Sequence, residues 1–220
     1  AARATNMTAY RAFWDAFQHP NAAAQRDAVA QFFAKHADLN ACHPINDLSG
    51  AQGIHDGFLA PLLDAFEGLY FRPDIQIGGT GYDGADWVSG MGHLVGTFRK
   101  DWCGIAPTDK LVTIRLGDFH RMENGQAVES YIYIDIPELL IQIGRYPLPL
   151  PQGTTTQVFG PATHDGLTGF DHDANRSAQT YQIMTDMLSG LATLDEAWRP
   201  YWHENMMWYG PASFGRFVGI

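Results

Sequence analysis

The sequence predicts an α+β fold in which helices pack on one face of a mainly antiparallel sheet. Helical patterns dominate up to residue 66, and strand patterns then follow one another as far as residue 134. This segregation of helices and strands argues against alternating parallel βαβ units. The clearest turn is Glu123-Asn124-Gly125, because Asn and Gly tolerate the positive φ that a tight hairpin connection needs. We therefore expect the strands on either side of this turn to form a hairpin.

The first 66 residues predict three helices and one strand. Residues 1–17 carry an aromatic stripe at i, i+3, i+4 and i+7, which is typical of a helix facing a core. Its members are Tyr10, Phe13, Trp14 and Phe17. A second helix is expected over 22–33, a strand over 36–44 and a third helix over 54–66. Pro61 lies within the third helix and predicts a kink or a late helix start.

Four further strands are expected, over 69–77, over 86–98 and as the two hairpin arms between residues 111 and 134. The glycines of the second of these strands predict bulges or a strongly curved sheet. They are Gly90, Gly92 and Gly96. The Gly-rich loop at 78–84 has no Lys and no following helix, so it is not predicted to bind phosphate.

Composition restricts the function. The net charge of −10 argues against binding to nucleic acid or to an anionic membrane surface, both of which favour basic proteins. The two cysteines, Cys42 and Cys103, are expected as free, buried thiols. No apolar run has the length of a membrane span, and no signal pattern opens the sequence, so a cytoplasmic location is expected.

The second strand of the last hairpin carries an unusual row of aromatic and acidic side chains on one face. Residues alternate with a period of two from residue 128, so alternate side chains share a face. These are Glu129, Tyr131, Tyr133 and Asp135. A carboxylate in an apolar, aromatic cavity has a raised pKa, which suits general acid–base catalysis. Two other interpretations remain open, namely a helix cap at Ile136 and a strand face turned to solvent.

Two stretches resemble a known family. One is the hairpin at 118–131 with Asp135 and 139–144, and the other is 92–98 with 104–110. In this order they resemble the SnoaL-like polyketide cyclases of the nuclear transport factor 2-like superfamily. The resemblance covers about residues 27–144. It implies a cone-shaped α+β barrel, in which a curved antiparallel sheet wraps on helices and a ligand occupies the mouth.

The resemblance also implies an activity. In the family, the Asp at the position of Asp135 is the acid–base residue of an intramolecular aldol cyclisation. Some cyclases carry, at the position of His120, a His that hydrogen-bonds a substrate oxygen. One position departs from the pattern, because Tyr131 or Ser130 stands where the family usually has Trp. The cavity wall is therefore expected to differ.

We therefore expect a cofactor-independent enzyme that transfers protons in a small, largely apolar carbonyl compound, by aldol cyclisation or isomerisation. Asp135 and His120 are the expected catalytic residues. The expected substrate contacts are His93, Trp87, Tyr131, Tyr133, Asn40 and His43. The alternative is a non-catalytic module on the same fold that binds a small ligand or a partner, because a fold alone does not decide function.

A metal site is not expected, because the nine histidines include no His-x-x-x-His and the cysteines form no metal-binding pair. His93 could instead be a core residue whose hydrogen bonds are satisfied, without any ligand contact. His120 could instead be exposed at the end of the hairpin.

The remainder of the chain predicts a second module. Residues 1–26 are expected as an N-terminal helical extension, 27–144 as the first module and 145–175 as a Pro- and Gly-rich linker. Residues 176–220 resemble the start of another copy, because 203–220 align with 36–54 with one gap. Since exposed apolar sheet faces tend to be covered, we expect a homodimer or pairing of two modules within one chain.

Overall fold

A computed structural model describes residues 2–19, 21–155, 157–160, 162–168, 173–193 and 195–219. The chain divides into two compact units. The first unit comprises residues 1–149 and 159–167, and the second comprises 150–158 and 168–220. Each unit is described by itself.

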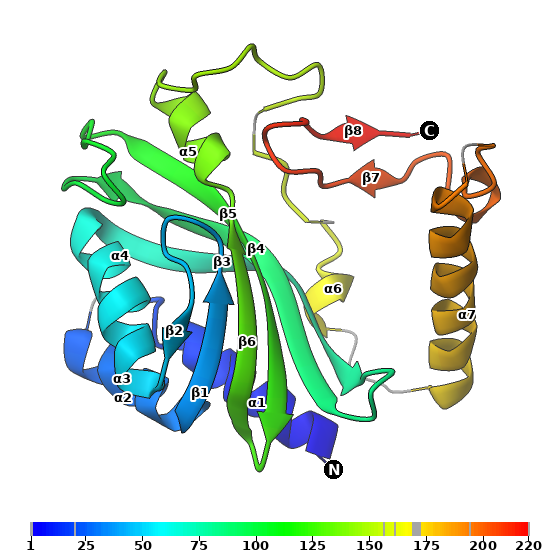
Figure 1. The fold of residues 1–220 in the computed structure, drawn as a ribbon, viewed down its shortest axis with the longest axis horizontal. Coiled ribbons are helices and arrows are strands. Elements are labelled where there is room, and N and C mark those ends of the chain that lie inside the picture. The colour runs from blue at the N-terminus through cyan, green and yellow to red at the C-terminus, as the bar shows by residue number, and fades with distance from the viewer. Residues whose placement is uncertain are drawn as a thin grey trace. The chain divides into compact units, whose positions relative to one another are not determined.

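The helices that precede strand β3 (Phe66–Thr80) lie together in the first unit (Figure 1). They are α1 (Ala2–Asp15), α2 (Ala22–Phe32), α3 (Ala51–Ile54), η1 (His55–Leu59) and α4 (Ala60–Ala65). The last three form one unbroken helix, which we call helix 51–65. Its middle is a π-helical turn in which the N–H of Ala60 bonds to the carbonyl of His55. Pro61 follows this widened turn, so the helix passes through the proline rather than starting late.

Six strands form one sheet in the order β2-β1-β6-β5-β4-β3. They are β1 (Phe33–Ala41), β2 (Leu48–Ser49), β3 (Phe66–Thr80), β4 (Asp86–Phe98), β5 (Leu111–Glu123) and β6 (Gln126–Ile134). All neighbours are antiparallel except β1 and β6, which are parallel. Asn124 and Gly125 have φ values of 52° and 81° at the β5–β6 turn. The predicted α+β fold and its hairpin are confirmed.

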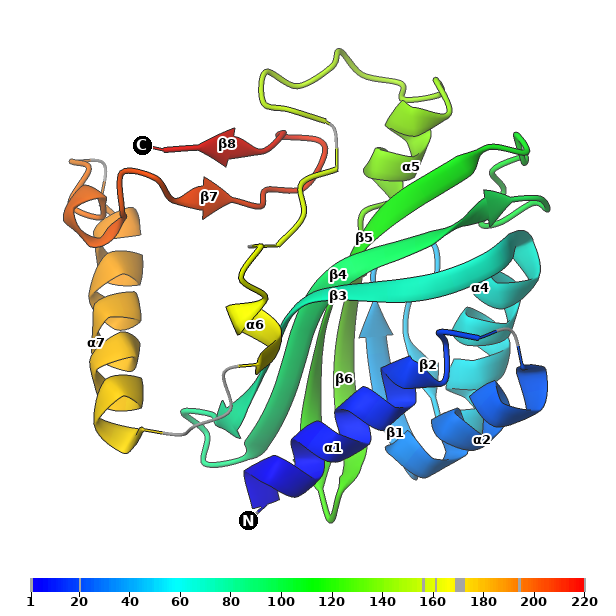
Figure 2. The ribbon, with the colours of Figure 1, turned by 180° about the vertical axis from the view of Figure 1, so that it is seen from behind.

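The sheet has an inner face that is covered by helices (Figure 2). Its other, outer face carries Tyr131 and Tyr133 of β6. The α1 aromatic stripe packs into the inner-face core, where Tyr10, Phe13 and Trp14 are at most 2% exposed. Phe32 stacks on Phe13 with ring centroids 4.6 Å apart. The helices at the start of the chain are therefore part of this core.

The glycines of β4 make room for side chains. A Cβ on Gly90 would lie 2.1 Å from the Tyr10 hydroxyl oxygen, and one on Gly92 would lie 2.7 Å from the Phe71 ring. The β4–β5 register shows no shift, whereas β3 has an irregularity between Pro73 and Ile75. The predicted bulges are therefore present in the β3–β4 pairing, opposite Gly92 and Gly96, and absent from the β4–β5 pairing.

The chain after β6 covers further parts of the sheet. Helix α5 (Ile136–Gln142) follows at once, and α6 (Asp165–Thr168) lies in the segment that was expected as a linker. Within this segment the N–H of Gly160 donates to Asp74 at 3.1 Å. The guanidinium carbon of Arg72 lies 3.9 Å from the centroid of the Phe159 ring. Phe159 and Gly160 therefore pack on β3.

The second unit contains α7 (Ala174–Leu191), η2 (Arg199–Tyr201), β7 (Met207–Trp208) and β8 (Phe217–Val218). Strands β7 and β8 pair antiparallel, with Trp208 opposite Phe217. Strands β1 and β2 pair with the same sequence separation, since Leu39 lies opposite Leu48. This agreement supports the second-module hypothesis, which stays a prediction.

Candidate functional site

The expected catalytic histidine lies in the core. The side chain of His120 is 0% exposed and points from the inner face of β5. Its ring lies 5.0 Å from the Phe32 ring and 5.7 Å from the Tyr10 ring, centroid to centroid. Its Nδ1 is 2.8 Å from the Ser130 hydroxyl on the facing strand. The open alternative of an exposed hairpin-end histidine is therefore wrong.

Asp118 lies beside His120 and is the centre of a buried network. One carboxylate oxygen accepts from the Tyr10 hydroxyl at 2.7 Å and from the N–H of Gly90 at 2.9 Å. The other accepts from the Trp14 indole N–H at 2.9 Å. The pKa of Tyr10 is raised well above its usual value, mainly by burial and secondly by the negative charge of Asp118. The hydroxyl therefore stays protonated and donates.

The contact between His120 and Asp118 is electrostatic. His120 Nε2 is 3.1 Å from a carboxylate oxygen, but the oxygen lies off the N–H direction, so no hydrogen bond forms. Asp118, His120 and Ser130 have the residue types of a nucleophilic triad. All three are 0% exposed, however, so no substrate reaches the hydroxyl. The arrangement is a polar network enclosed by the core.

Sequence reasoning did not select Asp118 or Ser130. The signal was available, because Asp118 precedes His120 by two residues and therefore shares its strand face. Ser130 alternates with the outward row of β6 and lies directly opposite His120 in the hairpin register. Assigning the side chains of both hairpin strands to faces at the same time would have placed Asp118, His120 and Ser130 together.

Asp135 caps the helix that follows its strand, which is one of the interpretations left open for it. Its side chain accepts from the N–H of Glu138 at 3.2 Å and so caps α5. The other oxygen is 3.8 Å from the Arg115 guanidinium. Asp135 is 9% exposed. The chain bends after Ile134 to start α5, so strand alternation no longer fixes the direction of the next side chain.

Tyr131, Tyr133 and Trp87 share a site, but on the outer face, so their expected place beside Asp135 and His120 is wrong. They line a cavity of about 580 Å³ together with Tyr82 and other residues. The further lining residues are Gly81, Asp83, Phe119 and Glu129. We call this the aromatic pocket. Its volume lies within the range of about 300–1,000 Å³ that is typical of small-molecule sites.

Two carboxylates, Glu129 and Asp83, line the aromatic pocket and accept hydrogen bonds from its rings. The Tyr131 hydroxyl donates to Glu129 at 2.6 Å, and Arg121 Nε donates to the same carboxylate at 3.0 Å. These two hydrogen bonds hold the pKa of Glu129 below its usual value. Asp83 accepts from the Trp87 indole N–H at 3.3 Å. The pocket therefore combines ring faces with two carboxylates, which disfavours an anionic ligand.

The remaining expected contacts are dispersed. Asn40 lines an adjoining cavity of about 380 Å³ that shares Glu129 and Tyr131 with the aromatic pocket. His43 is exposed at the end of β1. His93 is 0% exposed, and its Nδ1 lies 2.9 Å from Asp74. His93 is therefore a core residue, but its Nε2 has no hydrogen-bond partner among the described residues, so the position is not fully satisfied.

The described residues give no sign of a metal site, because no three of their His, Cys, Asp and Glu side chains cluster to hold an ion. Cys42 is half-buried and Cys103 is exposed, and both are free. The expectation that both thiols are buried is wrong for Cys103, which sits in a turn with φ of 54°. Among the described helices, none is long and apolar enough to cross a membrane.

Comparison with known proteins relates the sequence to one family and the fold to solved structures. The profile of the SnoaL-like polyketide cyclase family matches residues 4–143. The chain is similar to a candidate SnoaL-like polyketide cyclase from Jannaschia sp. CCS1, with 16% identity and a TM-score of 0.54 over 67% of this chain and 95% of that one. It is similar to AclR, a candidate hydroxylase from Streptomyces galilaeus, with 18% identity and a TM-score of 0.53 over 66% and 99%.

A third similar structure is IdmH, a candidate polyketide cyclase from Streptomyces antibioticus, with 15% identity and a TM-score of 0.52 over 63% and 98% of the two chains. No curated protein matches the chain. These structural likenesses show the fold, and the family profile spans more than half of the sequence. The chain belongs to the SnoaL-like polyketide cyclase family.

Proposed function

We propose that this chain binds a flat, largely apolar carbonyl compound in the aromatic pocket without transforming it. The observation that carries the proposal is the gathering of Trp87, Tyr131 and Tyr133 around one cavity of ligand size. The rings of Trp87 and Tyr131 lie 6.5 Å apart at an interplanar angle of 32°. Such inclined rings offer their faces to a planar ligand, which they stabilise by stacking.

Tyr133 supplies the polar contact in this proposal. Its side chain is 58% exposed, and its hydroxyl makes no hydrogen bond within the described part of the chain. The hydroxyl of Tyr131 is occupied, because it donates to Glu129. Tyr133 is therefore available to donate to a carbonyl oxygen. The carboxylates of Asp83 and Glu129 select against anionic ligands.

Calorimetric titration with flavone, a flat neutral carbonyl compound, tests the binding. Trp87→Ala removes the largest ring face and is expected to weaken binding on the order of tenfold, which corresponds to about 1.4 kcal/mol. Tyr133→Phe keeps the ring and is expected to give a smaller loss. Tyr70→Phe changes a tyrosine that does not line the pocket and is the matched control. Equal affinities of the wild-type protein and Trp87→Ala would refute the proposal.

The second candidate function is the acid–base catalysis that family membership suggests, with Asp135 and His120 as its residues. The hydrogen bond to Glu138 and the enclosure of His120 weigh against it. The test is exchange of the α-protons of 1-tetralone in D₂O, followed by NMR. Our proposal expects no acceleration above buffer. An acceleration that falls about a hundred- to ten-thousand-fold in Asp135→Asn would establish the catalytic function instead.

A further inference from the structure

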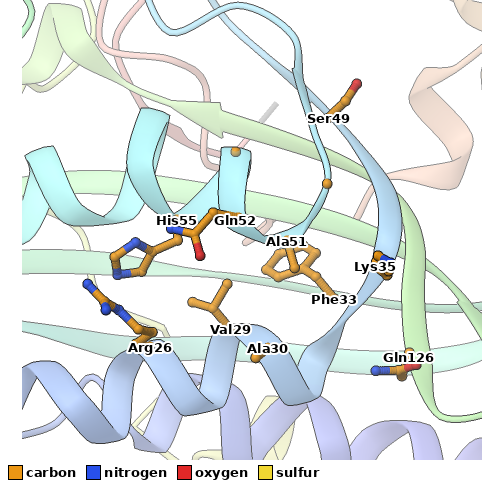
Figure 3. Close-up of a pocket in the computed structure, with 12 residues that line it drawn as sticks. Arg26, Val29, Ala30, Phe33, Lys35, Ser49, Ala51, Gln52, His55 and Gln126 are labelled. Atoms are coloured by element: carbon orange, nitrogen blue, oxygen red, sulfur yellow. The ribbon is translucent and has the colours of Figure 1, made fainter.

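A second cavity of about 540 Å³ lies on the helical side of the first unit, between α2, β1 and the start of helix 51–65 (Figure 3). It shares no lining residue with the aromatic pocket. Its polar lining includes Arg26, Lys35, Gln52 and His55. We call it the basic cleft, because its only charged or titratable lining residues are basic.

Two of these cations have no partner. Neither Arg26 nor Lys35 forms an ion pair or a side-chain hydrogen bond within the described residues, and both are exposed. Several other cations of the first unit are paired, as Arg99 is with Glu67 at 2.7 Å and Arg121 with Glu129 at 3.0 Å. Two unpaired cations on one cavity are unusual in a chain with a net charge of −10.

A buried imidazole lines the same cleft. The His55 side chain is only 10% exposed, and its Nδ1 lies 2.7 Å from Asp56. Its Nε2 makes no hydrogen bond among the described residues. Figure 3 shows the His55 ring and the Arg26 guanidinium at the same end of the cleft. In the imidazolium form both ring nitrogens donate, so Nε2 is available to an acceptor in the cleft.

The Asp56 carboxylate lies beside this end, where it contacts His55 at 2.7 Å. Hydrogen bonds from Gln52 and then His55 hold the pKa of Asp56 below its usual value, and the charge of Arg26 adds to the effect. The carboxylate is therefore already satisfied from within its own helix. It does not neutralise Lys35, which lies on β1.

The start of helix 51–65 adds backbone donors. Gly50 precedes it with φ of 76° and provides no side-chain cap. The N–H groups of Ala51, Gln52 and Gly53 have no acceptor among the described residues, as expected for the first turn of a helix. All three residues line the cleft. The partial positive charge at the helix start favours an anion there.

We propose that the basic cleft binds a small organic oxyanion, a carboxylate or phosphate monoester with a compact apolar body. Arg26 and His55 would hold the anionic group with charge-assisted hydrogen bonds. Lys35, at the other end of the cleft in Figure 3, adds positive charge to the same cavity. The apolar part of the lining consists of Val29, Ala30, Phe33 and Ala51. This wall gives an aryl or short alkyl group an apolar surface. The proposal is independent of the aromatic pocket, whose carboxylates favour neutral or cationic ligands.

Titration calorimetry with phenyl phosphate, inorganic phosphate and neutral benzyl alcohol tests the proposal on the full chain. We expect one site for phenyl phosphate, weaker binding of inorganic phosphate and no binding of benzyl alcohol. The double variant Arg26→Gln/Lys35→Gln is expected to lose on the order of tenfold or more in affinity. The control is Lys110→Gln/Arg176→Gln, which removes the same charge from two exposed cations outside the cleft. It is expected to bind almost as the wild-type protein does.

Gly53 gives a second test that preserves the fold. A Cβ at Gly53 would meet no atom within 4 Å, and φ is not in the positive region. Gly53→Ala is therefore expected to keep binding, whereas Gly53→Glu introduces a carboxylate into the cleft and is expected to abolish it. Equal binding by the wild-type protein and Gly53→Glu would overturn the proposal. So would equal binding of phenyl phosphate and benzyl alcohol, or no measurable binding of either phosphate.

Discussion

Asp118→Asn is the most informative perturbation of the core. The carboxylate accepts three hydrogen bonds and contacts His120, while it is fully buried. An amide in its place has only one acceptor oxygen. Its NH₂ group therefore faces either the Gly90 N–H or the Trp14 N–H, and that buried donor loses its partner.

The magnitude follows from these contacts. One buried donor left without a partner costs about 1–3 kcal/mol. The hydrogen bonds that remain change from charged to neutral, which weakens each by about 1 kcal/mol. We therefore expect Asp118→Asn to lower the free energy of unfolding by about 3–5 kcal/mol, a large share of the roughly 5–15 kcal/mol typical of a domain.

Urea unfolding followed by circular dichroism measures the loss. The matched control is Asp83→Asn, because Asp83 also accepts from an indole N–H, that of Trp87, but is exposed. Surface substitutions of this kind change stability by about 0.5 kcal/mol or less. If Asp118→Asn changed the free energy of unfolding by no more than this control does, the buried network would not stabilise the fold, and the reasoning would be wrong.

Two further predictions test the close packing of β4 and the pairing of His93. Gly90→Ala places a Cβ 2.1 Å from the Tyr10 hydroxyl and is expected to cost about 1–3 kcal/mol in urea unfolding, whereas Gly117→Ala, whose Cβ meets nothing nearer than 3.8 Å, is expected to be tolerated. Burial opposes ionisation of Asp74, but the hydrogen bonds from His93 and Gly160 outweigh it and hold the pKa of Asp74 below its usual value. Its stabilisation is therefore complete above the unfolded pKa of about 3.9 and is lost as pH falls through the lower folded value. Asp74→Asn is expected to reduce the difference between urea midpoints at neutral and strongly acidic pH, and an unchanged difference would contradict this assignment.

Local periodicity predicted most of the fold. The aromatic stripe of α1, the β5–β6 hairpin with its Asn-Gly turn and the run of strands were all visible in the sequence. Each of these features depends on neighbours within a few residues, and such local rules decide element type and strand face. The ordered motifs around Asp118 and Gly92 also indicated the family.

Local patterns did not reveal which face of the sheet is the inner one. Alternation places Tyr131 and Tyr133 on a common face, but either face satisfies a period of two. The choice was made by α1, whose rings pack with the face that carries His120. Gly90 supports the same choice. A Cβ at this position would collide with the Tyr10 hydroxyl, which could then not reach Asp118.

By itself, the sequence determined the α+β class, the hairpin, the family and three of the aromatic residues that line the outer pocket, Trp87, Tyr131 and Tyr133. Only the tertiary structure decided what the polar residues do. Asp135 caps α5, because the chain turns immediately after β6, and His120 is enclosed by rings from α1 and α2. The basic cleft joins Arg26, Lys35 and His55 from three elements. Burial, pairing and access depend on contacts between segments far apart in the chain, and no pattern within one segment records them.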